Sequence, residues 1–179
     1  MKLLVVLGSV RKGRAGEKVA KWVLDDLEQR SDIDVDFADL AKLELPMEMQ
    51  ETIPAAIKDY QYESPETREW SKRVREAEAI LIVTPEYNHS VSAALKNALD
   101  QLYSEWEGKP VGLVGYGTRG ATDAVKHLEW LAGPLKYLVA EPKVAIPRIW
   151  EAFDQQGNLK DEQEHKTNLH AILDALSAS

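Results

Sequence analysis

The stretch AILIVTPEYNHS, residues 79–90, joins a continuous apolar run to a polar loop. Its first five residues are apolar at consecutive positions, which is typical of a strand buried on both faces. Pro85 restricts Thr84 to extended conformations and ends this strand. An apolar pattern with helical spacing follows from Val91 to Leu102, and the order of strand, loop and helix indicates an α/β protein.

The same alternation continues on either side of that stretch. Further strands are predicted at 3–7, 33–37, 111–114 and 143–146, and the alternating pattern of 33–37 indicates an edge strand. Further amphipathic helices are predicted within 19–27, 66–77, 121–132 and 169–176. This pattern predicts a single flavodoxin-like domain over residues 1–179, with a doubly wound, five-stranded parallel sheet in the order 2-1-3-4-5 and helices on both faces. Residues 41–64 have no clean period and predict a long loop that is functional or interfacial.

Composition narrows the classes of function. The formal net charge of −8 does not suit nonspecific binding to nucleic acid or to anionic lipid. The chain has no cysteine, which excludes disulfides, thiolate catalysis, Cys-ligated zinc and iron–sulfur clusters. Basic residues follow the first apolar run instead of preceding it, so we expect no signal peptide, and no apolar window is long enough to predict a membrane span. The sequence therefore predicts a cytoplasmic protein with neither a nucleic-acid nor a membrane partner.

In doubly wound sheets, ligands bind at the carboxyl ends of the strands, near the point where the strand order reverses. The first loop, GSVRKGRAG at residues 8–16, follows the first predicted strand. Its glycines permit close approach of the backbone, Ser9 offers a hydroxyl, and Arg11 and Arg14 offer charged donors before a helix. This loop is either a phosphate cradle or a solvated basic connection, and it lacks the Walker and Gly-x-Gly-x-x-Gly patterns. Glu17 suits a helix N-terminus but would compete with a bound phosphate.

Two further loops follow predicted strands. The second loop, residues 84–90, offers backbone donors and an aromatic ring, the set of groups that the edge of a flavin requires. Asn88 or Ser90 could instead cap the following helix, and His89 could be a general acid or simply face solvent. The third loop, residues 115–121, has three glycines. They indicate either backbone packed against a flat ligand or close packing of strand against helix.

These motifs together resemble those of the NADPH-dependent FMN reductase family, which includes chromate, quinone and azo-dye reductases. The resemblance covers residues 1–146 and rests on GSVR at 8–11, TPEYNHS at 84–90, LKNALD at 95–100 and GYG at 115–117. The family usually has Pro-Gly where this chain has Ser92-Ala93, and often a glycine where Ala121 stands; the small residues here keep the space. The resemblance implies FMN, a flavodoxin-like fold and a homodimer or homotetramer.

The resemblance also implies which residues bind the cofactor. The first loop of the family holds the FMN phosphate, the second borders the isoalloxazine ring, and the third touches the other edge of that ring. Carried over position by position, these roles fall on Ser9, Arg11, Arg14, Gly16 and Glu17, then on Pro85, Glu86, Tyr87 and Asn88, and finally on Tyr116, Gly117 and Gly120.

The implied function is electron transfer from NADPH (or NADH) through bound FMN to a small-molecule acceptor, such as a quinone, an azo compound, free flavin or a metal oxyanion. A ping-pong order is expected, with no catalytic side chain and no metal. One alternative is a noncatalytic flavodoxin-type electron carrier, which the arginines of the first loop disfavour. Another is a nucleotide-phosphate enzyme or binding module without flavin. The apolar face of 91–102 with Tyr103, Trp106, Trp150 and Phe153 is either core or a surface for a second copy.

Overall fold

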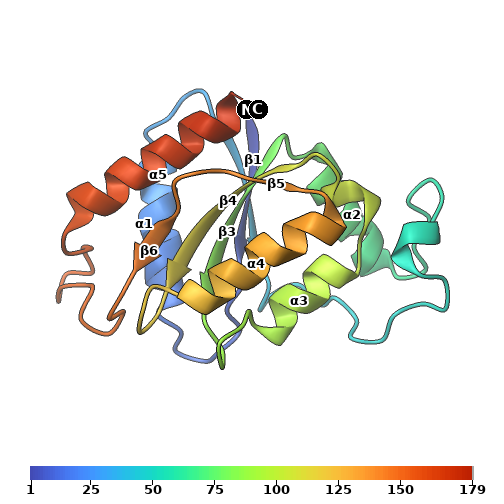
Figure 1. Ribbon diagram of the computed structural model, residues 1–179, viewed down its shortest axis with the longest axis horizontal. Coiled ribbons are helices and arrows are strands. Elements are labelled where there is room, and N and C mark those ends of the chain that lie inside the picture. Colours follow the sequence, from blue (N-terminus) through green and yellow to red (C-terminus); the bar gives the residue numbers. More distant parts are fainter. Residues whose placement is uncertain (179) are drawn as a thin grey trace.

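A computed structural model gives the structure of residues 1–178, in which a parallel sheet lies between two layers of helices (Figure 1). The strands are β1 (Lys2–Leu7), β2 (Asp34–Asp39), β3 (Ala79–Pro85), β4 (Pro110–Tyr116), β5 (Leu138–Val139) and β6 (Val144–Ile146). The α-helices are α1 (Gly16–Leu27), α2 (Pro65–Glu76), α3 (Ala93–Asp100), α4 (Thr122–Leu135) and α5 (Glu162–Ser177). Two short 3₁₀ helices are η1 (Pro54–Ala56) and η2 (Ser104–Trp106).

The strand order is β2-β1-β3-β4-β5, and every pairing is parallel. This confirms the predicted order and places β2 at an edge. The fifth position holds two short strands where the sequence predicted one: β5 pairs with the start of β4 through Leu138, and β6 pairs with its end through Ile146. With only two residues, β5 is too short to leave a recognisable pattern in the sequence.

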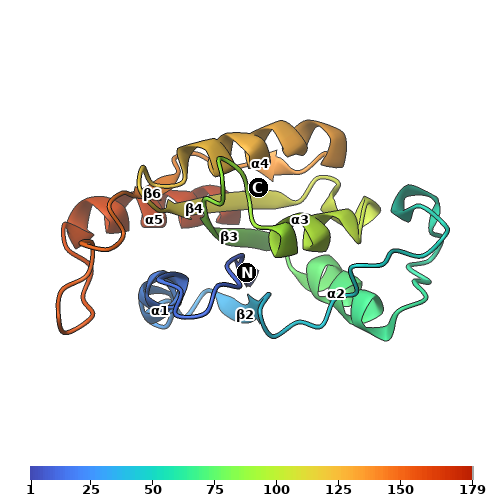
Figure 2. The ribbon, with the colours of Figure 1, turned by 90° about the horizontal axis from the view of Figure 1, so that it is seen from below.

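The consecutive apolar residues of the central strands face two separate cores. Leu4, Ile80 and Ile82 pack in the core that α2, α3 and α4 cover. Leu3 and Leu81 pack in the core that α1 and α5 cover, and Figure 2 shows these two groups of helices on opposite sides of the sheet. Because side chains alternate between the faces of a strand, burial on both sides requires an apolar residue at every position.

Serine side chains cap the N-termini of two helices, α2 and α3. Ser64 caps α2 by accepting hydrogen bonds from two backbone N–H groups, and Pro65 occupies the first helical position. Ser92 caps α3 in the same way, with 3.1 Å between its Oγ and the amide nitrogen of Leu95. Its hydroxyl also donates to the carbonyl of Gly8. The departure from the family pattern at position 92 thus ties the start of α3 to the first loop.

Residues 41–64 are attached to the sheet domain through apolar packing of Leu43, Leu45 and Ile57 against the core and through several polar contacts. The side chains of Asn97 and Gln101 donate to the carbonyl of Pro46 at 3.1 and 2.7 Å. Tyr62 is buried and donates to Oε1 of Glu105 at 2.8 Å. Burial and the neighbouring carboxylate both raise the pKa of Tyr62. The predicted long loop is therefore held at several points along its length, including Ile57 directly after η1.

The residues predicted as either core or interface differ in burial. Trp106 and most apolar residues of α3 are buried in the core of the chain itself, and Tyr103 and Phe153 are partly buried against the two cores. Trp150, in contrast, is largely exposed. The expectation of a homodimer or homotetramer stays a prediction. None of the helices within residues 1–178 is both long enough and apolar enough to span a membrane.

Candidate functional site

The three loops singled out in the sequence leave the carboxyl ends of β1, β3 and β4, which are neighbours in the sheet. The first and second loops are in contact, with 3.0 Å between Ser9 Oγ and the hydroxyl oxygen of Tyr87. The first loop also receives the side chain of Tyr116 from the end of β4, beside Gly16. The strand order therefore brings all three loops to one edge of the sheet, as predicted.

The start of α1 has backbone donors that the chain leaves unused. Its N-cap, Ala15, supplies no side-chain hydrogen bond. Within residues 1–178, no hydrogen bond has a backbone N–H of Ser9 to Glu17 as its donor. Unpaired N–H groups and the positive end of the helix dipole together favour an anion at this position. The structure thus favours the phosphate cradle over a mere solvated connection.

The two arginines of the first loop have different environments. Arg11 is exposed, and its guanidinium carbon lies 5.0 Å from the centre of the Tyr87 ring. The side chain of Arg14 is only 6% exposed and forms an ion pair with Asp39 at 2.5 Å. Arg14 also donates to the carbonyl of Ser9 and, at 3.3 Å, to Glu17. Arg11 is therefore the arginine that is available to an incoming anion, and Glu17 is partnered by Arg14.

The second loop folds into a tight turn. Tyr87 and Ser90 exchange backbone hydrogen bonds of 2.8 and 3.1 Å, and Asn88 and His89 have φ values of +48° and +64°. Positive φ at both central residues is the signature of a type I′ turn. The N–H of Tyr87 is used inside this turn, whereas no hydrogen bond in the described part of the chain uses the N–H of Asn88 or His89. The cap of the following helix is Ser92, so neither Asn88 nor Ser90 serves that purpose.

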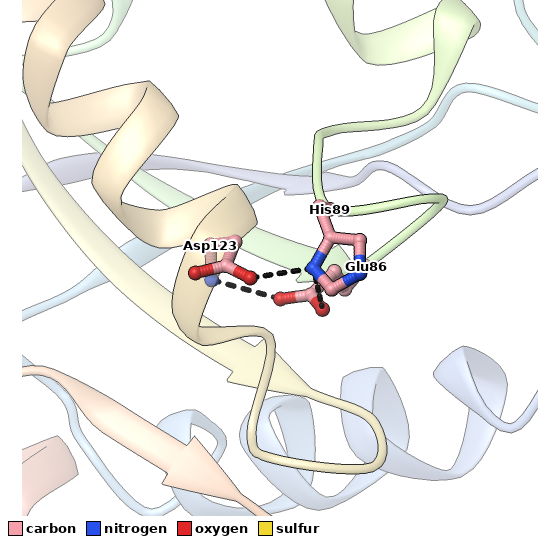
Figure 3. Close-up of side chains that lie close together, drawn as sticks. All are labelled: Glu86, His89 and Asp123. Atoms are coloured by element: carbon pink, nitrogen blue, oxygen red, sulfur yellow. Dashed lines mark hydrogen bonds and ion pairs between the residues drawn. The ribbon is translucent and has the colours of Figure 1, made fainter.

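Side chains of the second loop hold the start of α4 (Figure 3). Oε2 of Glu86 accepts a hydrogen bond of 2.8 Å from the N–H of Asp123. Nδ1 of His89 lies 2.6 Å from Oδ2 of Asp123, and the same oxygen accepts from Arg119 at 2.8 Å. These partners lower the pKa of Asp123, with the hydrogen bond from His89 as the largest cause. Glu86, expected at the flavin ring, therefore points its carboxylate at the N-terminus of a helix.

Glu86, His89 and Asp123 also satisfy the geometry of a metal site, since one ligand atom from each lies within 4.8 Å of the others. Each group already has a partner inside the chain. The carboxylate of Glu86 accepts a hydrogen bond from the N–H of Asp123, and the carboxylate of Asp123 is bonded to His89 and Arg119. The side chain of His89 is 75% exposed. Ion pairing and helix capping are sufficient reasons for this cluster.

Tyr116 was expected at the ring edge, but its side chain reaches the first loop. A Cβ added to Gly16 would clash with the hydroxyl oxygen of Tyr116 and lie 2.9 Å from its Cζ. That hydroxyl is buried and has no hydrogen-bond partner of acceptable geometry in residues 1–178. Burial raises the pKa of Tyr116 to about 12, although the nearby Ser9 hydroxyl acts in the opposite direction. A buried polar atom without a partner costs free energy, so this hydroxyl has unused capacity beside the phosphate cradle.

The glycines of the third loop are explained largely by packing. Gly120 has φ of +69°, and a Cβ there would lie 2.8 Å from the Cβ of Ala145 in β6. Ala121 caps α4 with a left-handed φ of +59°, the conformation for which a glycine is better suited. The N–H of Gly117 donates to the carbonyl of Ile146 at 3.1 Å. Close packing of strand against helix therefore accounts for Gly120.

Asp39 lies outside the set of site residues predicted from the sequence. It ends β2, which was predicted to stop at Phe37, and the pairing of β1 with β2 places it opposite Leu7. A polar residue at the carboxyl end of a strand was the signal used for the other loops, and the same rule would have found it had the strand been predicted two residues longer. Three features around the first loop suit the phosphate of a mononucleotide: unused backbone N–H groups, the exposed Arg11 and the buried hydroxyl of Tyr116.

Comparison with known proteins agrees with this geometry. A family model described as NADPH-dependent FMN reductase matches residues 1–151. The chain is 38% identical to an NAD(P)H-dependent FMN reductase of Schizosaccharomyces pombe, over 82% of this chain and 74% of that protein. It is 32% identical to a 2-hydroxy-1,4-benzoquinone reductase of a Burkholderia species, over 99% of this chain and 95% of that protein.

Among solved structures, the fold is similar to that of FerB, a flavoenzyme NAD(P)H:(acceptor) oxidoreductase from Paracoccus denitrificans. The TM-score is 0.75 and the sequence identity 25%, over 99% of this chain and 97% of FerB. The match of the family model spans all three loops, and the two relatives align with this chain over most of their own lengths. This chain belongs to the NADPH-dependent FMN reductase family.

Proposed function

We propose that the protein binds FMN at the edge formed by the three loops and uses it to pass electrons from NADPH or NADH to a small acceptor. The observation that carries this proposal is the run of unused N–H groups at the start of α1, beside the exposed Arg11. A phosphate would satisfy these donors and meet both the helix dipole and a guanidinium. Membership of the family supports FMN as the group that carries this phosphate.

Each loop has a role in this proposal. The first loop binds the phosphate through the backbone from Ser9 to Gly16 and through the side chain of Arg11. Arg14 shapes the loop, and Glu17 is held away by Arg14. The backbone from Pro85 to Asn88 and the ring of Tyr87 border the isoalloxazine, while Glu86 fixes the second loop against α4. The backbone of Gly117 and Gly120 lines the remaining edge.

When bound, FMN would supply the redox chemistry, which is hydride acceptance from the nicotinamide and electron delivery to the acceptor. The chain contributes stabilisation of negative charge near the ring through the unused N–H groups of Asn88 and His89 at the tip of the turn. The proposal assigns no side chain as acid or base, because hydride transfer depends on stacking geometry and not on a positioned proton donor. We infer a ping-pong order, in which the dinucleotide leaves before the acceptor occupies the same face.

The acceptor that the comparisons favour is a quinone. The Burkholderia relative, which aligns over nearly the whole chain, is named a benzoquinone reductase. A flat conjugated acceptor such as a quinone also suits a site where transfer depends on stacking and not on a positioned acid. The rival function, a noncatalytic flavodoxin-type carrier, would bind FMN at the same edge without turnover of NADPH.

The phosphate assignment predicts that Arg11→Ala weakens FMN binding about tenfold or more, because a charge-assisted hydrogen bond is lost. Riboflavin, which lacks the phosphate, should bind both proteins equally. Quenching of flavin fluorescence on titration of the apoprotein measures both affinities. Lys12→Ala is the matched control, since it removes an adjacent exposed cation that, within residues 1–178, has no hydrogen bond, ion pair or ring contact with the second loop. Equal loss of FMN and riboflavin in Arg11→Ala would count against the assignment.

A further inference from the structure

Asp39 is a buried carboxylate next to the proposed cofactor site. It ends β2, beside the carboxyl end of β1, and is only 7% exposed. Oδ2 of Asp39 lies 2.5 Å from a terminal nitrogen of Arg14, and Oδ1 accepts a hydrogen bond of 3.1 Å from the N–H of Ala41. The ammonium of Lys42 is 3.9 Å away and largely exposed. Arg14 is therefore the principal counter-charge of Asp39.

Arg14 links Asp39 to the rest of the first loop. Another of its terminal nitrogens donates to the carbonyl of Ser9, and the Oγ of Ser9 lies 3.0 Å from the hydroxyl oxygen of Tyr87. A continuous chain of hydrogen bonds thus runs from β2 through Arg14 to the first loop and on to the second. The rigid, planar guanidinium can hold several acceptors at once, and a lysine cannot reproduce this geometry.

We propose that Asp39 is a positioning residue for the cofactor: by fixing Arg14 against Ser9 it holds the first loop in the shape that binds the FMN phosphate. This inference rests on the proposed function and adds a residue outside the three loops. It also assigns Arg14 a different role from Arg11. Arg14 fixes the conformation of the first loop through its contacts with Ser9 and Asp39, and Arg11 contacts the phosphate.

If Asp39 acted only through its charge, its substitution would change the affinity for FMN in the direction opposite to the one that a positioning role predicts. Replacing Asp39 by Asn removes a negative charge near the phosphate site and frees the cation of Arg14, which by itself would strengthen FMN binding. The positioning role predicts weaker binding instead, because Arg14 loses the partner that fixes it and the loop loses its shape. Removing one member of a buried ion pair also leaves the other charge uncompensated. The direction of the change therefore separates the two accounts.

The experiment compares the affinities for FMN and for riboflavin in four proteins: the wild type and the variants Asp39→Asn, Arg14→Gln and Asp36→Asn. Asp36 is the matched control, since it lies on the same strand and pairs with Arg73 at 2.6 Å, away from the first loop. We expect Asp39→Asn and Arg14→Gln to weaken FMN binding about tenfold and to leave riboflavin binding nearly unchanged. Asp36→Asn should lower the melting temperature without changing the ratio of the two affinities.

The outcomes separate this inference from the proposed function. Unchanged or tighter FMN binding in Asp39→Asn would overturn the positioning role, and so would an equal loss of FMN and riboflavin. If the wild type binds no FMN, the proposed function itself fails. Should Asp39→Asn not fold, the double variant Arg14→Gln/Asp39→Asn, which leaves no buried charge unpaired, is compared with Arg14→Gln alone. Equal FMN affinities support the inference, because Asp39 then has nothing left to hold, and a further loss in the double variant refutes it.

Discussion

At the residue scale, the contact between Gly16 and Tyr116 shows how closely the first loop and the end of β4 approach. A glycine at the first position of α1 is ordinarily a disadvantage, since alanine favours a helix by about 1 kcal/mol. Here the buried ring of Tyr116 fills the space that a Cβ would need. The residue patterns identified both positions as site residues, but this contact could not be predicted, because it joins parts of the chain that are 100 residues apart in sequence.

Gly16→Ala should therefore destabilise the protein by about 1–3 kcal/mol, the usual cost of overpacking. The measurement is urea denaturation followed by circular dichroism. Tyr116→Phe removes the hydroxyl that a Cβ would strike, so adding it to Gly16→Ala should recover part of the loss. Tyr116→Phe alone should be close to neutral, because that hydroxyl has no partner of acceptable geometry to lose within residues 1–178. A stable Gly16→Ala variant would show that the ring has room to move.

At the element scale, the start of α4 depends on a residue of another element. Its N-cap, Ala121, has no capping side chain, and Glu86 of the second loop supplies the acceptor across space. Local signals predicted the existence of the helix from its apolar spacing. They could not predict the carboxylate that caps it, nor the positive φ values of Asn88 and His89 in the turn that follows Glu86. The two-residue β5 was missed for a related reason, since it is defined by pairing with β4 and not by its own pattern.

Glu86→Ala should cost about 1 kcal/mol of stability, the typical value of a lost N-cap. Glu86→Gln keeps an oxygen acceptor and should lose less. Hydrogen exchange at the amide of Asp123 reports on this contact directly, and we expect it to be faster in Glu86→Ala than in Glu86→Gln. Exchange in Glu86→Ala that is as slow as in the wild type would mean that Glu86 does not cap α4 in solution.

At the scale of the whole molecule, the alternation of strands with helices predicted a doubly wound sheet and its order, and each central strand is apolar at consecutive positions. That pattern requires helices on both faces, and the two cores supply them. The same order brings three loops to one edge, which is why candidate site residues could be chosen before the structure was known. What could not be predicted depends on register: only the pairing of Leu7 with Asp39 places a buried carboxylate beside Arg14.

The central claim is that the whole molecule is an FMN-dependent reductase and not an electron carrier. The most direct test is the steady-state oxidation of NADPH by the FMN-loaded protein, followed at 340 nm with a benzoquinone as acceptor. We predict sustained turnover that depends on both FMN and quinone and that falls in Arg11→Ala at limiting FMN. A protein that binds FMN stoichiometrically but oxidises NADPH no faster than free FMN does would contradict the claim.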